Sequence, residues 1–327
     1  MIAGAYIPIG YNKVSILTIL VTGAGGFIGS RLCHFLSKEF PKSSIIGIGR
    51  RDSSLNLQKT SNYEYIVCEL RKGDLDKKLP VKIDALIHLA GDRRTFVNSA
   101  NYTSQAISNI EMTLNVADYA VHAKANQFIF PSSGYVYSGN SSLPFKEDDV
   151  GIPIDNLGAS KLAAEALLKA RAFSGQFNLL TLRIFTVYGP GSGDDQFIPQ
   201  TITKLRSTEP IARFGAPDVI RDFIYIDDVL LAMKAGLYFG EKGVPYEVLN
   251  VGTGVQTSIR EAVLLIADIV GTQKQIEFAP DSRKNDRTDI YHQADITRIY
   301  SVLNWKPKID LRNGLKKTIE SFHSGKA

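Results

Sequence analysis

Residues 16–29 read ILTILVTGAGGFIG, and this stretch decides the fold that we expect. Its apolar first half is typical of a buried strand, and the apolar residues around and beyond its last glycine recur with helical spacing. Gly23, Gly26 and Gly29 form a G-x-x-G-x-x-G pattern at the junction, where small residues let backbone N–H groups approach a pyrophosphate closely. The positive end of the helix dipole adds to the attraction for that anion. We therefore expect a strand, a glycine turn and a helix that hold a dinucleotide.

The alternation of strands and helices continues along the first half of the chain. Further β-like runs follow the glycine turn, and two long amphipathic segments, 104–123 and 157–173, lie between the later runs. The β-like runs are Ser44–Ile48, Tyr65–Cys68, Ala85–Leu89, Gln127–Pro131 and Leu179–Ile184. Alternating strands and helices favour a parallel sheet covered on both faces, which is the Rossmann-type doubly wound α/β fold.

The regular alternation ends after Ile184, at a segment rich in Gly, Pro and Asp over Tyr188–Asp195. Shorter helices and strands follow without the βαβ rhythm, which indicates a smaller C-terminal α/β lobe for the substrate. We expect the dinucleotide-binding domain to comprise 1–184 with about 221–243, and the substrate lobe to comprise about 185–220 with 244–327. At 327 residues the chain is long enough for both.

Composition narrows the possible partners. The net charge of +5 is modest and the 38 basic residues form no block, which disfavours nucleic-acid binding and suits phosphate-bearing small molecules. No apolar run reaches the ~20 residues of a membrane-spanning helix, and the N-terminus lacks the pattern of a secretory signal. Cys33 and Cys68 form no disulfide framework, and the histidines and cysteines match no metal spacing. We expect a cytoplasmic protein that binds neither a membrane nor a metal.

The end of the second strand bears on the choice of cofactor. NAD-specific sites commonly place a carboxylate there to bind the ribose hydroxyls, but the run here is Gly49-Arg50-Arg51. A guanidinium group matches the oxygens of a 2′-phosphate, so Arg50 and Arg51 favour NADP. The alternative is NAD, with both arginines solvated and Asp52 bonded to the ribose.

Several motifs, in order along the chain, resemble those of the extended short-chain dehydrogenase/reductases, the family of nucleotide-sugar epimerases and dehydratases. The resemblance extends from Ile16 to about Ile319. The matching stretches are TGAGGFIG at 22–29, HLAG at 88–91, Asn109, SSGYVY at 132–137, RIFTVYGP at 183–190, RDFIYIDD at 221–228, NVGTG at 250–254 and WKP at 305–307. So many matches in one order are not expected by chance.

The resemblance implies roles for individual residues. The cofactor would be lined by Gly23, Gly26, Phe27, Ile28, Gly29, Glu69, Leu70, Ala90, Gly91 and Lys161, with Glu69 and Leu70 beside the adenine. Ser133 would hydrogen-bond the reacting sugar oxygen, Arg221 would bind the substrate diphosphate, and Thr186 stands where the family has a substrate-contacting asparagine. The alternative for Ser133 is a strand-end hydroxyl bonded to its own backbone.

The YxxxK motif of the family is incomplete in this chain. The aligned segment is LGASK at 157–161, which keeps Lys161 and puts Leu157 where the family has its catalytic tyrosine. Leucine has no exchangeable proton, and the loss of a positioned acid or base costs about 10² to 10⁴ in rate. Tyr135 is the first candidate to replace the tyrosine, and its alternative role is an aromatic wall of the sugar pocket. Further candidates are Tyr137, Lys161 itself, Ser133 with a water, and Asp92.

These expectations describe an NADP-linked enzyme, with NAD as the alternative cofactor, that acts on a nucleoside-diphosphate hexose as a 4-keto-sugar reductase or an epimerase. A 4,6-dehydratase is not expected, because Gly134-Tyr135 replaces the acidic pair that dehydratases of the family carry. The second hypothesis is a non-catalytic NAD(P)-binding subunit that lost its chemistry with the tyrosine. The resemblance also implies a homodimer that forms through segments 104–123 and 157–173.

Overall fold

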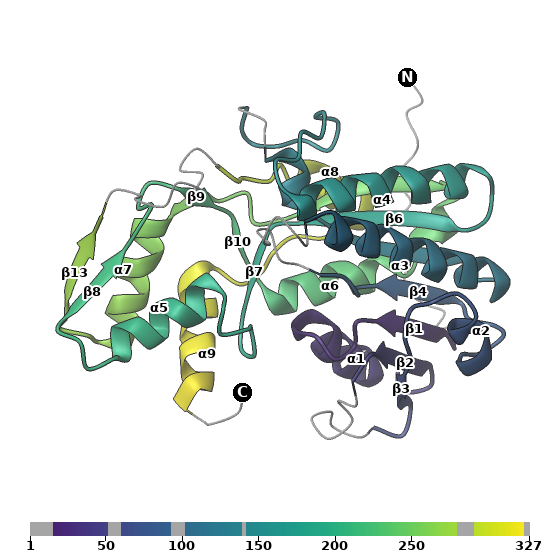
Figure 1. The fold of residues 1–327 in the computed structure, drawn as a ribbon, viewed down its shortest axis with the longest axis horizontal. Helices are drawn as coiled ribbons and strands as arrows, with labels where there is room; N and C mark the ends of the chain where they lie inside the picture. The colour runs from purple at the N-terminus through teal and green to yellow at the C-terminus, as the bar shows by residue number, and fades with distance from the viewer. Residues whose placement is uncertain (1–15, 52–59, 93–101, 139–141, 280–290, 324–327) are drawn as a thin grey trace.

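A computed structural model describes residues 16–51, 60–92, 102–138, 142–279 and 291–323 of the chain. Its centre is a seven-stranded sheet in the order β11-β6-β5-β4-β1-β2-β3, in which every neighbouring pair is parallel (Figure 1). The strands are β1 (Thr18–Thr22), β2 (Ser44–Gly49), β3 (Tyr63–Val67), β4 (Ala85–His88), β5 (Gln127–Ser133), β6 (Asn178–Ile184) and β11 (Tyr246–Val251). The strand order reverses between β1 and β4, so the predicted doubly wound Rossmann-type α/β fold is confirmed.

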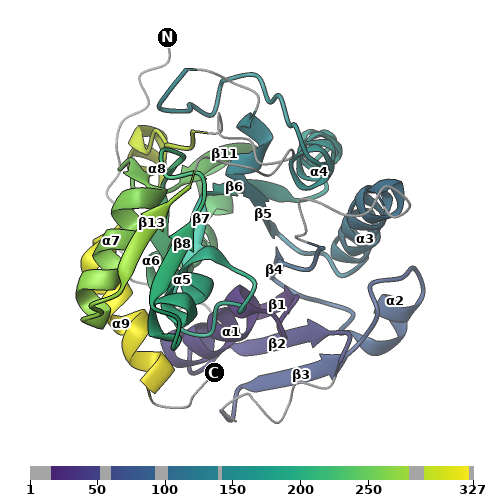
Figure 2. The same ribbon diagram turned by 60° about the vertical axis from the view of Figure 1, so that its left-hand side comes forward.

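Helices cover both faces of this sheet. α3 (Tyr102–His122) and α4 (Asn156–Phe173) lie side by side on one face, and α1 (Phe27–Glu39) and α6 (Ile226–Gly236) lie on the other (Figure 2). Alternate residues of a strand point to opposite faces, and β1 follows this rule: Ile19 and Val21 belong to the apolar cluster under α1, and Leu20 belongs to the one under α3. Burial on both faces explains why these strands are apolar throughout.

β11 lies outside the region to which the sequence analysis assigned it. We expected 244–327 to belong to the substrate lobe, but β11 pairs with β6 along its whole length and forms one edge of the large sheet. α8 (Thr297–Leu303) packs against β11, so it too belongs with the sheet. The boundary at 244 is therefore wrong. Its cause is that a short apolar strand has the same sequence pattern whichever sheet it joins.

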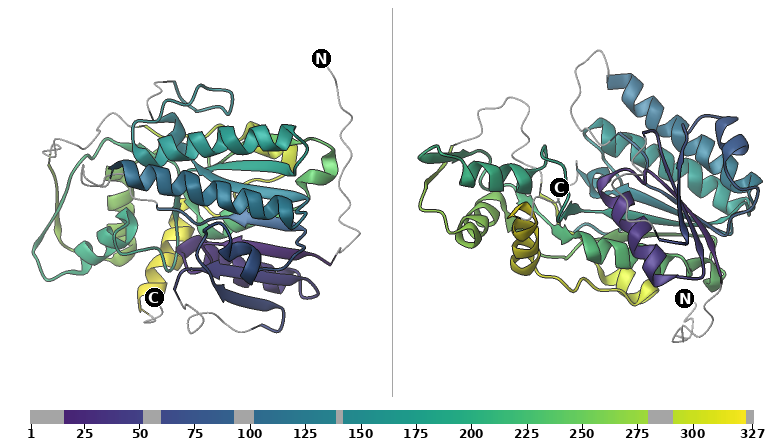
Figure 3. Two further views of the ribbon diagram at one scale, coloured as in Figure 1. Left: turned by 45° about the vertical axis from the view of Figure 1, so that its right-hand side comes forward. Right: turned by 90° about the horizontal axis from the view of Figure 1, so that it is seen from below.

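A smaller group of elements extends from the carboxyl edge of the sheet (Figures 1 and 3). We call this group the substrate lobe, and it consists of α5 (Phe197–Arg206), β8 (Ile211–Phe214), α7 (Ile259–Val270) and β13 (Gln275–Phe278). β8 and β13 pair in parallel, and α5 packs against α7. α9 (Leu311–His323) packs on α7 and on β10 (Phe223–Tyr225) and so connects the lobe to the rest of the molecule. In the described part of the chain, no helix is both long and apolar enough to cross a membrane.

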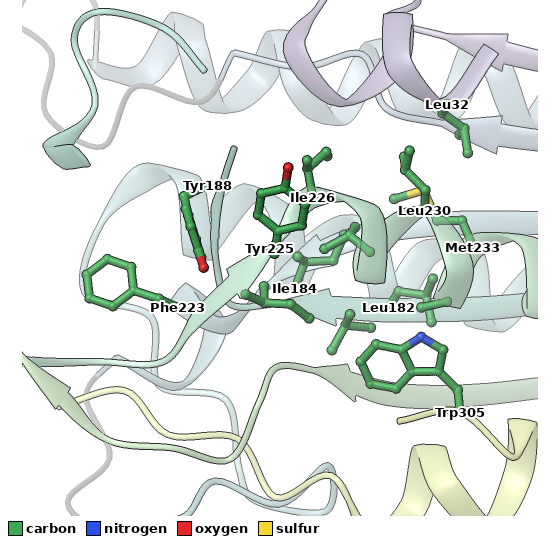
Figure 4. Packing of buried hydrophobic residues seen from close by; sticks show 14 of the residues in the cluster. Leu32, Leu182, Ile184, Tyr188, Phe223, Tyr225, Ile226, Leu230, Met233 and Trp305 are labelled. Atoms are coloured by element: carbon green, nitrogen blue, oxygen red, sulfur yellow. The ribbon is translucent and has the colours of Figure 1, made fainter. Parts of the chain in front are cut away.

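An apolar cluster fills the junction between the sheet and the lobe (Figure 4). Within it, Tyr188 on β7 (Thr186–Tyr188) meets Phe223 on β10 edge to face, with ring centroids 6.3 Å apart. At the other end of the cluster, Nε1 of Trp305 donates a hydrogen bond of 3.1 Å to the backbone oxygen of Asp228 on α6. This packing fixes β10, which begins two residues after Arg221, and thereby the position of that arginine.

Candidate active site

A cleft of about 1320 Å³ lies between the carboxyl edge of the sheet and the substrate lobe. Its wall starts at the glycine turn after β1, passes the ends of β2, β4, β5 and β6, and continues onto α5 and β8. The predicted site residues on this wall are Gly23, Gly26, Phe27, Ile28, Gly29, Arg50, Gly91, Ser133, Tyr135, Lys161, Thr186 and Arg221. The carboxyl edge of a parallel sheet is the usual place for a ligand in this class of fold.

The glycine turn leaves no room for a side chain at two of its positions. Gly23 has a φ of +73°, and a Cβ atom there would lie 2.7 Å from the backbone nitrogen of Ala90. A Cβ atom on Gly29 would lie 2.2 Å from the carbonyl oxygen of Gly23. The start of α1 therefore approaches the turn as closely as backbone atoms allow, and Phe27 and Ile28 in its first turn line the cleft. This geometry suits an anion at the N-terminus of α1.

The two arginines after β2 lie in different surroundings. Both side chains are exposed, and of the two Arg50 lines the cleft. The carbonyl oxygen of Arg51 accepts a hydrogen bond of 2.7 Å from the hydroxyl of Tyr65. Asp52, the alternative ribose ligand, lies outside the described residues. Arg50 is thus the member of the pair that belongs to the cleft wall.

Three other predicted cofactor residues do not reach the cleft wall. Glu69 is exposed and pairs with Arg71, with 2.9 Å between Oε2 and Nε. Leu70 is buried in the apolar core on the α3 side of the sheet. Ala90 lies between two residues of the wall, and its N–H is bonded to the side chain of Thr22 at 3.2 Å. Glu69 and Leu70 therefore lie off the cleft wall, whereas the backbone of Ala90 packs directly against Gly23 of the glycine turn.

A buried chain of hydrogen bonds fixes the strand ends beside the glycine turn. The hydroxyl of Thr113 donates to the backbone oxygen of Asn109 (2.8 Å), so it accepts from Nε2 of His88 (3.1 Å). Nδ1 of His88 then accepts from the hydroxyl of Thr22 (2.7 Å). Burial, with a smaller effect from the charge of Lys161, lowers the pKa of His88 to about 3, so the imidazole is neutral. His88 consequently ties β1, β4 and α3 together without adding a charge.

α4 brings Leu157 and Lys161 to the cleft, one helical turn apart. The ammonium nitrogen of Lys161 donates a hydrogen bond of 2.7 Å to the backbone oxygen of Pro131 on β5, and it lies 4.5 Å from the ring centroid of Phe130. Burial lowers the pKa of Lys161 to about 8, although the charge of Glu165 acts in the opposite direction. The helix thus presents a wholly apolar side chain and, beside it, a lysine that readily loses its proton.

Ser133 lies at the cleft where β5 ends. A short 3₁₀ helix, Gly134–Tyr137, begins immediately after it, and the Ser133 hydroxyl oxygen accepts a hydrogen bond of 3.2 Å from the backbone N–H of Tyr135. This is the backbone role that the sequence analysis kept as an alternative. The two roles are compatible, because an oxygen that accepts from the backbone can still donate its own proton to a ligand.

Tyr135 faces the substrate-lobe side of the cleft. Its ring meets the ring of His292 edge to face at 5.1 Å between centroids. Burial lowers the pKa of Arg221, and Tyr135 acts on that pKa in the opposite direction, so the two side chains lie near each other. Burial and then the charge of Arg221 lower the pKa of His292 to about 3. His292 was missed in the sequence because an isolated histidine forms no pattern. Its Nε2 has no hydrogen-bond partner among the described residues.

Tyr137 does not belong to the site, which rules it out as a replacement for the missing tyrosine. Its side chain is fully buried, and its hydroxyl accepts from Nη1 of Arg183 (2.7 Å) and donates to Oδ1 of Asn250 (2.9 Å). Arg183 also forms a buried ion pair with Glu165, with 2.7 Å between Nη2 and Oε2. Burial raises the pKa of Tyr137, so its phenol keeps its proton. This network holds the ends of β6 and β11 together beneath the cleft wall.

The substrate lobe supplies cleft residues that the sequence did not suggest. Thr186 on β7 lines the cleft as expected, and its backbone N–H donates to the oxygen of Asp222 at 3.0 Å. Beyond it, the wall is formed by Gln196, which precedes α5, by Gln200 and Lys204 on α5, by Arg213 and Phe214 on β8, and by residues around them. These residues escaped notice because no local motif connects a helix face with a strand end. Among the described residues, no cluster of three or more side chains is suited to a metal ion.

Comparison with protein-family models finds one match. Residues 19–252, which comprise the whole seven-stranded sheet apart from the first residue of β1, match the model of the NAD dependent epimerase/dehydratase family.

Individual relatives cover nearly the whole chain. The UDP-glucuronate 4-epimerase of Thermodesulfobacterium geofontis is 29% identical over 314 residues, which are 92% of this chain and 94% of the relative. The dTDP-D-glucose 4,6-dehydratase of Homo sapiens is 29% identical over 341 residues, covering 98% of this chain and 94% of the relative. Among solved structures, the UDP-glucuronic acid 4-epimerase of Bacillus cereus, in complex with UDP-glucuronic acid and NAD, superposes with a TM-score of 0.81 at 28% identity and covers 94% of this chain and 99% of its own.

Proposed function

The chain belongs to the NAD dependent epimerase/dehydratase family, and from this premise we infer that it is an enzyme that modifies a nucleotide sugar. We propose that it reduces a 4-keto sugar or epimerises a sugar through a 4-keto intermediate, on a nucleoside-diphosphate hexose. The observation that supports this proposal is the continuity of one cleft from the glycine turn, past Ser133 and Lys161, to Arg221 and the substrate lobe. A cofactor at one end and a nucleotide sugar at the other would meet at Ser133.

The residues at the sheet end of the cleft fit a nicotinamide dinucleotide. Gly23 and Gly29 have no room for a side chain, which leaves their backbone open to a pyrophosphate at the start of α1. Gly91 and Lys161 would then border the nicotinamide end, with Lys161 donating to the ribose. When bound, the cofactor supplies the hydride acceptor and donor for the sugar carbon. The chain itself holds the sugar and moves the proton.

We propose NADP as the preferred form of the cofactor, with Arg50 as the ligand of its 2′-phosphate. Arg50 lines the cleft at the end of β2, and the described residues at that strand end carry no carboxylate. The epimerase of Bacillus cereus was solved with NAD, which is the competing preference.

For the substrate we propose three contacts. Arg221, partly buried beside Tyr135, would bind the diphosphate, because a guanidinium group in a partly desolvated cleft attracts phosphate oxygens strongly. Ser133 would donate its hydroxyl proton to the reacting sugar oxygen, and Thr186 would bind the sugar nearby. Dehydration is not part of the proposal, since positions 134 and 135 carry no carboxyl group to remove and return the required protons.

The test is incubation of the purified chain with NADP(H) and, separately, NAD(H), against a panel of nucleotide sugars and their 4-keto-6-deoxy derivatives. Products are identified by mass spectrometry and sugar NMR. A new epimer or a reduced sugar is the expected result. Cofactor binding without any product would overturn the proposed reaction and leave a non-catalytic NAD(P)-binding subunit.

We further propose that the protein is a homodimer that pairs through α3 and α4. Each of these helices exposes an apolar side chain, Ile107 on α3 with 56% of its surface accessible and Leu167 on α4 with 41%. Light scattering should give twice the chain mass of 36.0 kDa, and Ile107→Asp combined with Leu167→Asp should give the monomer. A monomeric unmodified protein would contradict the proposal.

The cytoplasm remains the proposed location. Cys33 and Cys68 are both free thiols, which suits a reducing compartment. Cell fractionation with antibody detection tests this, and recovery in an oxidising compartment would contradict it.

A further inference from the structure

The proposed reaction transfers a proton as well as a hydride. The structure limits which side chains can transfer the proton. When a hydroxyl becomes a carbonyl its proton must leave, so an acid/base group has to lie on the cleft wall close to the reacting oxygen. Tyr137 is excluded because its hydroxyl is buried between Arg183 and Asn250. Leu157 lies on the wall but has no proton to exchange.

Tyr135 and Lys161 both lie on the wall, but their neighbours differ. Tyr135 packs on His292 and lies beside Arg221, both of which belong to the end that would take the substrate diphosphate. Lys161 lies near the cofactor end. Its charge contributes to the lowered pKa of His88, and His88 is hydrogen-bonded to Thr22, the residue before the glycine turn. Hydride transfer takes place next to the cofactor, so the position of Lys161 matches the reacting carbon better.

The contacts of Lys161 allow it to lose and regain a proton without moving. Its hydrogen-bond acceptor is the backbone oxygen of Pro131 at 2.7 Å, and a neutral amine donates to a carbonyl as an ammonium does. Loss of the proton also creates a lone pair that can accept from a hydroxyl in the cleft. The centroid of the Phe130 ring lies 4.5 Å from the nitrogen, so an aromatic face covers one side of the amine.

Among the described residues, the charged groups around Lys161 provide no dedicated counter-ion. Glu165 on the same helix is bonded to Arg183 at 2.7 Å and accepts from the hydroxyl of Ser132. His88 faces it from β4 and is neutral. Burial consequently outweighs the attraction to Glu165, and the pKa of Lys161 falls to about 8. Both protonation states are therefore populated near neutral pH.

We propose that the ε-amino group of Lys161 transfers the proton to and from the reacting oxygen of the sugar, in place of the tyrosine that Leu157 displaces. In the oxidative direction the O–H bond of the sugar breaks and its proton forms an N–H bond on the neutral amine, while the hydride leaves the same carbon for the nicotinamide cofactor. In the reductive direction the ammonium returns the proton to the carbonyl oxygen. This inference rests on the proposed function, and it makes Lys161 a catalytic residue.

The first test measures Lys161 directly and needs no turnover. The protein, without cofactor, is labelled with lysine carrying ¹³C at the ε position, and its NMR spectrum is recorded from pH 6 to pH 11. The signal that is absent from the spectrum of Lys161→Arg belongs to Lys161, and it should titrate near pH 8. An ordinary titration of Lys161 would overturn the inference.

The second test separates proton transfer from ribose binding. Lys161→Arg keeps a positive charge and its donors but does not release a proton in the physiological range, so kcat should fall by about 10² or more while the cofactor Kd changes far less. Lys161→Ala should be equally slow at saturating cofactor, and added methylamine should restore part of the rate in proportion to its concentration. The matched control, Lys169→Ala, should keep the rate of the unmodified protein with or without the amine.

The outcomes distinguish this inference from the proposed function. If the unmodified protein gives no product with any sugar, both fail. If it is active and Lys161→Arg keeps its kcat, or if methylamine fails to restore Lys161→Ala, the proposed function stands and the role of Lys161 is wrong. Loss of turnover in Tyr135→Phe or Asp92→Asn with retained turnover in Lys161→Arg would assign the proton to that residue instead.

Discussion

At the scale of single residues, burial sets the charge of the candidate site. His88 and His292 are neutral because both imidazoles are desolvated and each lies near a cation. Lys161 retains part of its charge because Glu165 opposes the desolvation. On the substrate side of the cleft, Arg221 lies on the wall together with Lys204 and Arg213, so this side offers cations to the proposed diphosphate.

Arg50 can be tested by its effect on cofactor preference. A hydrogen bond to a charged group contributes about 1.5–3 kcal/mol, so Arg50→Ala should weaken NADP binding roughly 10- to 100-fold and NAD binding by far less. Titration calorimetry measures both affinities, and Arg51→Ala, which removes a side chain outside the cleft wall, is the matched control with a smaller expected effect. Equal losses for NADP and NAD would refute a 2′-phosphate contact.

Ser133 can be tested by separating its hydroxyl from its size. Ser133→Ala should lower kcat by about 10² with little change in KM, because the lost hydrogen bond is strongest when charge develops on the sugar oxygen. Ser133→Thr keeps the hydroxyl and should retain most of the rate. Steady-state kinetics measure both parameters. An unchanged kcat in Ser133→Ala would show that the only role of the hydroxyl is to accept the hydrogen bond from the backbone N–H of Tyr135.

At the scale of elements, a non-glycine residue adopts a left-handed backbone conformation at the end of α3. Lys124 has a φ of +55° and follows the helix at the position where a left-handed residue closes it. The backbone N–H of Ala125 donates to the oxygen of Ala120, and that of Lys124 donates to the oxygen of Val121, which is the Schellman arrangement. Glycine adopts this conformation without the steric cost that a Cβ atom brings.

Lys124→Gly should therefore stabilise the protein. The gain in the free energy of unfolding should be about 1 kcal/mol, because the cost of the left-handed conformation is removed while a more flexible unfolded chain offsets part of it. Urea denaturation measures it. Lys124→Ala controls for the loss of charge, since it keeps the Cβ atom and should show little gain. If both variants gain equally, the effect arises from charge.

The sequence predicted elements well where a residue pattern has one physical cause. The glycine turn was expected because close backbone approach requires small residues. The parallel strands were expected because burial on two faces requires apolar runs, and α4 was expected because its apolar residues recur with helical spacing. β11 was assigned to the wrong lobe because strand pairing depends on residues far apart in the chain. His292 was missed, and the burial of Leu70 was not foreseen, for a related reason: burial depends on what packs above a residue, and local sequence does not record it.

At the scale of the whole molecule, two buried histidines make stability depend on pH. His88 is the last residue of β4, the middle strand of the sheet, and His292 lies between Tyr135, Phe145 and Phe185. Both side chains are buried, so both lose contact with water when the chain folds. Each has a pKa of about 3 in the folded protein and ~6.5 when unfolded. Between these values the unfolded chain binds more protons than the folded one, so the free energy of unfolding falls as the pH is lowered through this range.

Urea denaturation at pH 7 and pH 5 should reveal this dependence. The free energy of unfolding should fall by about 2 kcal/mol for each buried histidine. His292→Phe keeps an aromatic ring and removes the ionisable group, so it should reduce the fall by about half. His122→Gln, which replaces a histidine whose side chain is 67% exposed, is the control. An identical fall in His292→Phe would show that His292 takes no part.

The edge position of β11 has a consequence for the synthesis of the protein. On the ribosome the chain emerges from its N-terminus, so β6, whose Leu179, Leu180 and Leu182 are fully buried in the finished molecule, appears well before the strand that covers its edge. At about 5–20 residues per second, several seconds pass before residue 251 is available. During that interval the nascent sheet has an open, apolar edge that can pair with another chain. A chaperone that binds the nascent chain before β11 has paired with β6 would protect the protein from aggregation.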